Sequence, residues 1–245
     1  AYPGSGSGVA CAFNHPAWAL GTNGNSGRMA AGDSLIIDNI DHSTGSQAKY
    51  VVGYGMPNTV SANCNLYSPY DCTLNPPPSG ASATAPTIIA GAGYASGCTG
   101  FNTRGQMAQL WGTESVKQVL NLSNTNNVMV QCLEITDHSN CGFRVGTPLC
   151  SENYNGSSNG TYGRNGIFAA GGNNLSFRWL DVHGFSNRNF LMGGQTDITM
   201  SYVNMDAGYM SNWDGDVGAN SYFNGTILLD HVKNRFAGCS EAYPR

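Results

Sequence analysis

Charged side chains are scarce in this chain of 245 residues, because Asp, Glu, Lys and Arg together make up only 11% of it. The net charge is −4, and the eleven basic residues are scattered singly along the sequence. A protein that binds nucleic acid would show a basic patch or stripe, so we expect no nucleic acid as a partner. No apolar run is long enough to cross a bilayer, so we expect no membrane span.

Familiar catalytic and metal motifs are also missing. None of the eight cysteines forms a Cys-x-x-Cys or Cys-x-x-Cys-His element, which excludes a zinc ribbon and a haem attachment site. There is no Gly-x-Ser-x-Gly, no His-Glu-x-x-His and no phosphate-binding loop. The sequence therefore does not identify a common hydrolase, metalloprotease or nucleotide-binding enzyme.

Eight cysteines beside only three lysines favour an oxidising compartment, and we expect a secreted, extracellular or periplasmic protein. Residues 1–4 have the character of a start exposed by removal of a signal peptide. The short spacings predict the disulfides Cys64–Cys72 and Cys141–Cys150, with free thiols as the alternative.

A repeat lies between Leu120 and Arg235, in a chain rich in glycine, asparagine and serine. Its four segments are residues 128–135, 175–182, 198–205 and 227–234. The first, third and sixth positions are apolar in every segment, and the eighth is apolar in all but the last. The second, fourth and seventh positions are mostly polar. This pattern predicts a strand with a two-residue bend that is buried on one face.

A second apolar position, at Leu120, Ile167 or Phe190, precedes each of the first three segments by eight residues. One such unit cannot bury its own apolar face, so successive units must stack. The sequence therefore predicts an all-β parallel β-helix that forms one domain over residues 1–245. We expect its interior to contain Val128, Val130, Leu133, Leu175, Phe177, Leu180, Ile198, Met200 and Val203.

The flanking segments predict how the β-helix begins and ends. Residues 1–30 are expected to form an N-terminal cap, and residues 56–85 a long loop. Insertions at 140–164 and 208–224 interrupt the clearest repeats, which span residues 120–236. The last repeat breaks off without a capping segment, which suggests that the β-helix continues beyond residue 245 or is completed by a second chain.

Three stretches together resemble a known family: Gly32-Asp33-Ser34-Leu35-Ile36-Ile37, then Pro86-Thr87-Ile88-Ile89, then Asn127-Val128-Met129-Val130. They resemble the entry of secreted bacterial right-handed parallel β-helix repeat proteins, in the pectate-lyase-like superfamily. The resemblance covers most of residues 30–240 and implies a right-handed parallel β-helix. Members of that superfamily include polysaccharide lyases, glycoside hydrolases, esterases and adhesins. The paired-aspartate motif of polygalacturonases is absent here, so the fold does not decide the function.

Three outward columns of the repeats form ladders along the β-helix. The fifth position holds Cys132, Trp179, Tyr202 and His231. The seventh holds Glu134, Asp181, Asn204 and Lys233, and the ninth holds Thr136, His183, Asp206 and Arg235. Aromatic rings suit the apolar faces of sugars, and carboxylates act as acid and base in glycoside chemistry. The leading hypothesis is therefore a polysaccharide lyase or glycoside hydrolase.

In that hypothesis Asp181 and Asp206 are the catalytic carboxylates, and His183 is the proton-transfer partner. The predicted substrate-binding residues are Trp179, Tyr202, Arg178, Glu134, His231 and Arg235. The alternative from another class is a non-catalytic glycan- or protein-binding surface, and a purely structural solenoid is a third possibility. An enzyme needs ionisable groups clustered in an open groove, whereas a binding surface needs only aromatic and amide groups.

The segment Asn212-Trp213-Asp214-Gly215-Asp216 supplies three oxygen side chains at alternate positions. Asn212, Asp214 and Asp216 are therefore candidate calcium ligands. The downstream glutamate of an EF-hand is missing, and a plain Asp-Gly turn is the alternative.

Overall fold

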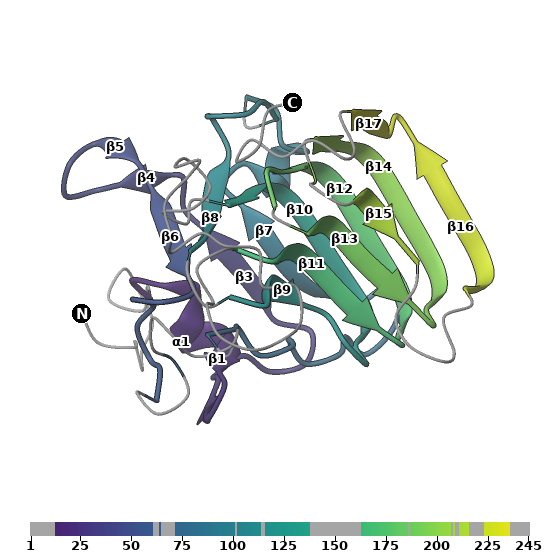
Figure 1. The fold of residues 1–245 in the computed structure, drawn as a ribbon, viewed down its shortest axis with the longest axis horizontal. Coiled ribbons are helices and arrows are strands. Elements are labelled where there is room, and N and C mark those ends of the chain that lie inside the picture. Colours follow the sequence, from purple (N-terminus) through teal and green to yellow (C-terminus); the bar gives the residue numbers. More distant parts are fainter. Residues whose placement is uncertain are drawn as a thin grey trace.

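The computed structural model describes residues 13–60, 64, 72–100, 102–113, 116–137, 163–185, 187–206, 208, 211–215 and 223–235. It confirms the predicted all-β parallel β-helix: one parallel sheet of nine strands and one of four strands alternate along the chain (Figure 1). No helix in these ranges is long and apolar enough to cross a membrane.

Each complete turn combines a long bent strand in the larger sheet with a shorter strand in the smaller sheet. The long strands are β10 (Asn126–Asp137), β12 (Asn173–His183) and β14 (Thr196–Asp206). The short ones are β9 (Gln118–Asn121), β11 (Asn165–Ala170), β13 (Arg188–Gly193) and β15 (Ser211–Asp214). Leu175 of β12 lies opposite Val128 and Ile198, so the predicted columns coincide rung by rung.

In the other turns the long strand is divided in two. The pairs are β3 (Ser34–Ile37) with β6 (Lys49–Val52), β7 (Thr87–Gly91) with β8 (Ala108–Gly112), and β16 (Asn224–Asp230) with β17 (Lys233–Arg235). The first gap holds a hairpin of β4 (Ile40–Asp41) and β5 (Ser46–Gln47). The second gap, residues 92–107, is an insertion that includes a 3₁₀ helix, Tyr94–Ser96. The sequence pattern did not single out this insertion.

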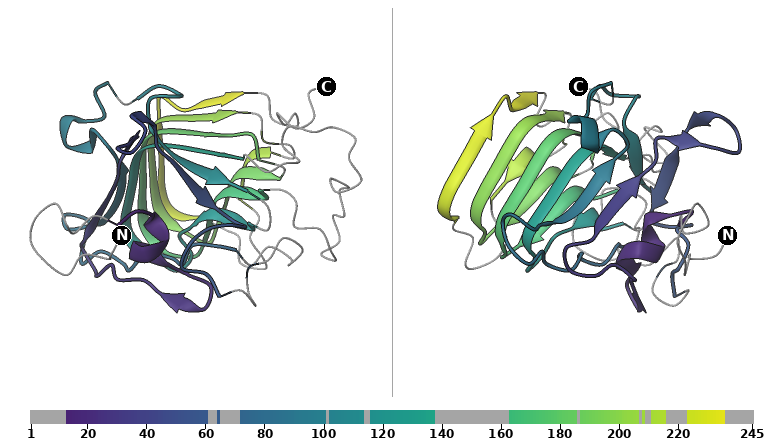
Figure 2. Two further views of the ribbon diagram at one scale, coloured as in Figure 1. Left: turned by 90° about the vertical axis from the view of Figure 1, so that its left-hand side faces the viewer. Right: turned by 180° about the vertical axis from the view of Figure 1, so that it is seen from behind.

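A short helix, α1 (Pro16–Leu20), covers the N-terminal end of the stack together with the hairpin β1 (Gly21–Thr22) and β2 (Asn25–Ser26) (Figure 2). His15 caps the helix, because its Nδ1 accepts a hydrogen bond from the Ala17 N–H at 3.0 Å. Ala17 and Leu20 are buried in the same apolar cluster as Ile37 of β3. An N-terminal cap is therefore present in residues 16–26, and the predicted bounds of 1–30 stay a prediction, because residues 1–12 lie outside the described ranges.

The interior is the apolar cluster that the repeat predicts. All nine inward residues named from the sequence are buried, and so are Leu120, Ile167 and Phe190 at the preceding positions. Phe177 and Phe190 meet edge to face across the interior, with ring centroids 5.5 Å apart. Burying one such side chain stabilises the fold by about 1.5–3 kcal/mol.

The long strands bend at two ladders of residues with left-handed backbone. The first ladder consists of Asn127, Asn174 and Asp197, with φ of 53°, 54° and 58°. Asn and Asp tolerate this conformation, and Asn174 Nδ2 also donates a hydrogen bond to Asn127 Oδ1 at 2.9 Å. The second ladder is the fifth column of the repeat, where φ is 56° at Cys132, 50° at Trp179, 56° at Tyr202 and 52° at His231. The predicted bend is confirmed, and bulky side chains occupy it.

Some expectations concern residues outside the described ranges. Nearly all of the insertion at 140–164, with Cys141 and Cys150, lies there, as do residues 236–245 beyond β17. Continuation of the β-helix past residue 245, or its completion by a second chain, stays a prediction.

Replacing Leu180 with Asp is expected to prevent folding. Leu180 is buried in the core between the rungs of β10 and β14, and an unpaired carboxylate there costs several kcal/mol. Circular dichroism and size-exclusion chromatography would check this, with Asn173→Asp, an exposed position on the same strand, as the matched control. A folded, soluble Leu180→Asp protein with native stability would contradict the assigned register.

Candidate functional site

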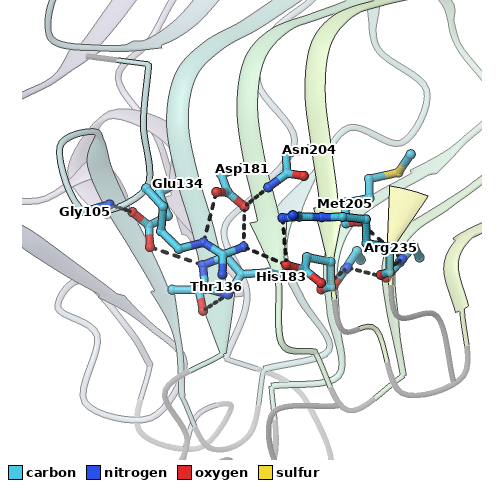
Figure 3. A network of polar contacts seen from close by, with 12 residues as sticks. Gly105, Glu134, Thr136, Asp181, His183, Asn204, Met205 and Arg235 are labelled. Atoms are coloured by element: carbon cyan, nitrogen blue, oxygen red, sulfur yellow. Dashed lines mark hydrogen bonds and ion pairs between the residues drawn. The ribbon is translucent and has the colours of Figure 1, made fainter. Parts of the chain in front are cut away.

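A polar network covers the outward face of the second half of the long strands (Figure 3). The register aligns Glu134, Asp181 and Asn204 on one ladder and Thr136, His183 and Asp206 on the next. Lys233 and Arg235 of β17 continue the two ladders. The structure therefore brings together the three predicted catalytic residues, together with Glu134 and Arg235.

Arg104, from the insertion at 92–107, lies across this network. Its Nε and Nη2 donate to the two carboxylate oxygens of Asp181 at 3.0 and 2.9 Å, and Nη2 also lies 3.4 Å from Asp206 Oδ2. Arg235 Nη2 approaches the same Asp206 oxygen at 3.1 Å. A bidentate guanidinium–carboxylate pair is among the stronger polar contacts in proteins. Each predicted catalytic carboxylate is thus already paired with an arginine.

Glu134 and His183 form the second part of the network. His183 Nε2 lies 3.1 Å from Glu134 Oε1, and His183 Nδ1 lies 3.3 Å from Thr136 Oγ1. The Gly105 N–H donates to Glu134 Oε2 at 2.7 Å. Burial raises the pKa of Glu134, but the hydrogen bonds from His183, Gln109 and Gly105 outweigh it and hold this pKa below its ordinary value.

The acidic groups of the network are more deeply buried than its arginines. Glu134, Asp181, His183 and Asp206 are each at most 8% exposed. The side chains of Arg104 and Arg235 are 38% and 51% exposed. The carboxylates therefore lie beneath the arginines, and both ring nitrogens of His183 already have hydrogen-bond partners. In this arrangement the network anchors residues 104 and 105 to the ladder face.

A disulfide provides a further anchor for the same insertion. Cys98 bonds to Cys132, which occupies the fifth column one rung before Trp179. Neither this pair nor the role of Arg104 was predicted from the sequence. The one hint in the sequence was that a cysteine, Cys132, stands in a column whose other members are aromatic. This cysteine attaches the insertion at 92–107 through its bond to Cys98. The predicted disulfide Cys64–Cys72 is confirmed, and Cys141–Cys150 lies outside the described residues.

The aromatic side chains of the fifth column form a continuous stack. The Trp179 and Tyr202 rings lie 4.0 Å apart with an interplanar angle of 7°, and the Tyr202 and His231 rings lie 4.5 Å apart at 13°. Tyr202 is 40% exposed, and the His231 side chain is 64% exposed. Because each ring covers its neighbour, the stack presents mainly ring edges to solvent. Exposed Arg178 and Lys233 occupy neighbouring outward positions.

The candidate calcium ligands have other partners. Asn212 is buried, its Oδ1 accepts from Asn189 Nδ2 at 2.7 Å, and its Nδ2 donates to the Arg235 carbonyl oxygen at 2.7 Å. Asp214 pairs with Arg188, and Asp216 lies outside the described residues. Among the residues that the structure describes, no group of three or more His, Cys, Asp or Glu side chains is arranged to hold a metal ion. Calcium binding stays a prediction.

Comparison of this chain with protein-family models, with curated proteins and with solved structures found no match. Inferences about function therefore rest on the geometry of two adjoining surfaces. One is the buried ion-pair network under Arg104, and the other is the stack of half-buried Trp179 with exposed Tyr202 and His231.

Replacing Arg104 with Ala is expected to destabilise the fold by about 1–3 kcal/mol, since it leaves the buried Asp181 carboxylate without its bidentate cation, which is itself 38% exposed. Urea unfolding would measure the loss. Lys117→Ala, which removes an exposed cation elsewhere, serves as the control. Identical unfolding curves for wild type and Arg104→Ala would contradict the anchoring role.

Glu134 predicts how acid changes stability. Its pKa is lower in the folded state, so its contribution is complete above the ordinary glutamate pKa of about 4.3 and is lost as the pH falls through the folded value. The difference in unfolding free energy between wild type and Glu134→Gln should therefore shrink as the pH falls below about 4. A difference that stays the same down to pH 3 would show that the carboxylate is not the stabilising group.

Proposed function

We propose that this protein is a secreted, non-catalytic glycan-binding β-helix of the pectate-lyase-like type. Its binding surface is the stack of Trp179, Tyr202 and His231 with the neighbouring Arg178 and Lys233. The occupant is a polysaccharide that lies along the β-helix axis, across successive rungs about 4.8 Å apart.

The contrast between the two bends supports this proposal most directly. Asn127, Asn174 and Asp197 at the first bend suit left-handed backbone, whereas Trp179 and Tyr202 at the second do not. A left-handed conformation costs roughly 1–2 kcal/mol for such residues, and a stacked ring pair returns about 0.5–1.5 kcal/mol. The left-handed backbone by itself would therefore favour Asn at these positions. Bulky side chains on strained backbone at the protein surface point to a use in binding.

The chemistry of the stack suits an oxygen-rich ligand. Aromatic rings carry partial positive charge at their edges, and edges are what this stack exposes. Sugar hydroxyl oxygens and uronate carboxylates are complementary to these edges and to the guanidinium and ammonium groups of Arg178 and Lys233. Few ring faces are left for a ligand, because Trp179 and Tyr202 cover each other and Tyr202 also covers His231.

Binding is favoured over catalysis because the acidic groups are engaged. A lyase or hydrolase reaction at Asp181 and Asp206 would require Arg104 to leave both carboxylates while they remain buried. The cost of unpairing buried charges makes this an unfavourable starting arrangement. A binding surface needs no such change, because the stack is exposed as it stands.

Tyr202→Asn tests the proposal, because Asn suits the left-handed backbone but removes the central ring. We expect a melting temperature equal to or above that of the wild type. The affinity for a polysaccharide selected from a panel of acidic and neutral glycans should fall at least about tenfold, or about 1.4 kcal/mol. Isothermal titration calorimetry or affinity electrophoresis would measure the affinity.

Asp197→Asn, at the other bend, is the matched control and should leave binding unchanged. Equal glycan affinity for Tyr202→Asn and wild type would reject the stack as the binding surface. Release of new reducing or unsaturated ends from a glycan, abolished by Asp181→Asn, would replace the binding function with the enzymatic one.

A further inference from the structure

A hollow with a volume of about 750 Å³ lies at the N-terminal end of the β-helix, away from the aromatic stack. It is bounded by the N-terminal cap, by β3 and by the segment that follows β7. Its apolar wall includes Phe13, Met29, Leu35, Ile36, Tyr50 and Tyr94. This volume falls within the range of about 300–1,000 Å³ that is usual for ligand sites.

The free edge of a sheet runs along this hollow. β3 is the last strand of the nine-stranded sheet at this end, and no strand in the described residues pairs with its outer edge. The carbonyl oxygens of Asp33 and Ile37 accept from the Ile88 and Ala92 N–H groups of the β7 side, each at 2.9 Å. Because alternate residues of a parallel strand face the same neighbour, the backbone groups of Ser34 and Ile36 face the hollow.

The opposite wall is fixed by His15 of the cap. Its Nε2 lies 2.7 Å from the Val51 carbonyl oxygen, and its ring meets Tyr50 edge to face with centroids 5.8 Å apart. Burial lowers the pKa of His15 to about 4, so the side chain stays neutral near neutral pH. The contacts of His15 therefore hold the cap against β6.

We propose that this hollow is a strand-acceptor site for an extended peptide segment of a partner protein. The segment pairs its backbone with the outer edge of β3 and continues the established sheet by one strand. An apolar side chain of the segment packs over Leu35, the half-buried inward residue of β3, whereas Ile37 is already covered by the cap. A polypeptide fits better than a glycan, because only a polypeptide repeats donors and acceptors at the spacing of the strand edge.

The pattern of the partner segment follows from the strands already stacked in this sheet. The inward column of Leu35 is apolar on successive rungs, since Leu35 lies opposite Ile89 and Ile89 lies opposite Val130, so the added strand should place an apolar residue in this column. Leu229, within residues 226–230, occupies this column in β16, because it lies opposite Met200, which lies opposite Phe177, which lies opposite Val130. A synthetic peptide of residues 223–231 is therefore a suitable probe.

Fluorescence anisotropy with the labelled peptide and the whole protein tests the proposal. We expect saturable binding, at least tenfold tighter than that of a scrambled peptide. Ile36→Lys, which places a charge on the free edge, should weaken binding at least tenfold. Ile40→Lys is the matched control, since Ile40 is 44% exposed against 43% for Ile36 but lies on β4, outside the hollow.

A second variant of the β3 edge keeps the proposal testable if Ile36→Lys does not fold. Ser34→Pro removes an N–H that faces the hollow and leaves the hydrogen bonds to β7 in place. Absence of saturable binding, or equal affinity for wild type and the folded edge variants, would overturn the proposal. Sedimentation velocity of the protein alone provides another decisive result. An Ile36-dependent dimer that excludes the peptide would make a second copy the occupant, and it would likewise overturn the proposal.

Discussion

Every turn of this β-helix must present the same columns as the turn before it. A strand that is buried on one face and only one turn deep has no core of its own, so Val128, Leu175 and Ile198 are buried only because they stack. The same register that aligns these inward residues also aligns the outward ones. The ion-pair network and the aromatic stack are therefore consequences of the packing of the interior, and a slip by one residue would remove both.

Docking of the insertion at 92–107 determines which outward residues remain accessible. Cys98 and Arg104 hold it to the ladder face, the first through a disulfide and the second through two carboxylates. Without Arg104, Asp181 and Asp206 would be two like charges on adjacent rungs that repel each other. With it, they become a buried anchor, while Trp179 and Tyr202 stay at the surface. One inserted segment thus separates the structural part of the face from the part available to a ligand.

The sequence predicts the repeating part of the fold well, because periodicity is local information. Leu133, Leu180 and Val203 are assigned to the interior by position alone, and the short spacing of Cys64 and Cys72 favoured the disulfide that the structure contains. Arg104 and Cys98 could not be placed in this way, because no pattern says where an irregular insertion folds back. The aromatic column was predicted as a set of available ring faces, but it presents ring edges, since rungs so close together force the rings to cover one another.

The stack also connects turns that are otherwise held together only by their immediate neighbours. Trp179, Tyr202 and His231 belong to three successive turns, and the last of these turns, with β16 and β17, is the most exposed of those described. A linear polymer that contacts all three rings would span those turns and couple their opening. Ligand binding would then stabilise the three turns together against unfolding. The last turn, which is the most exposed, would gain the most stability.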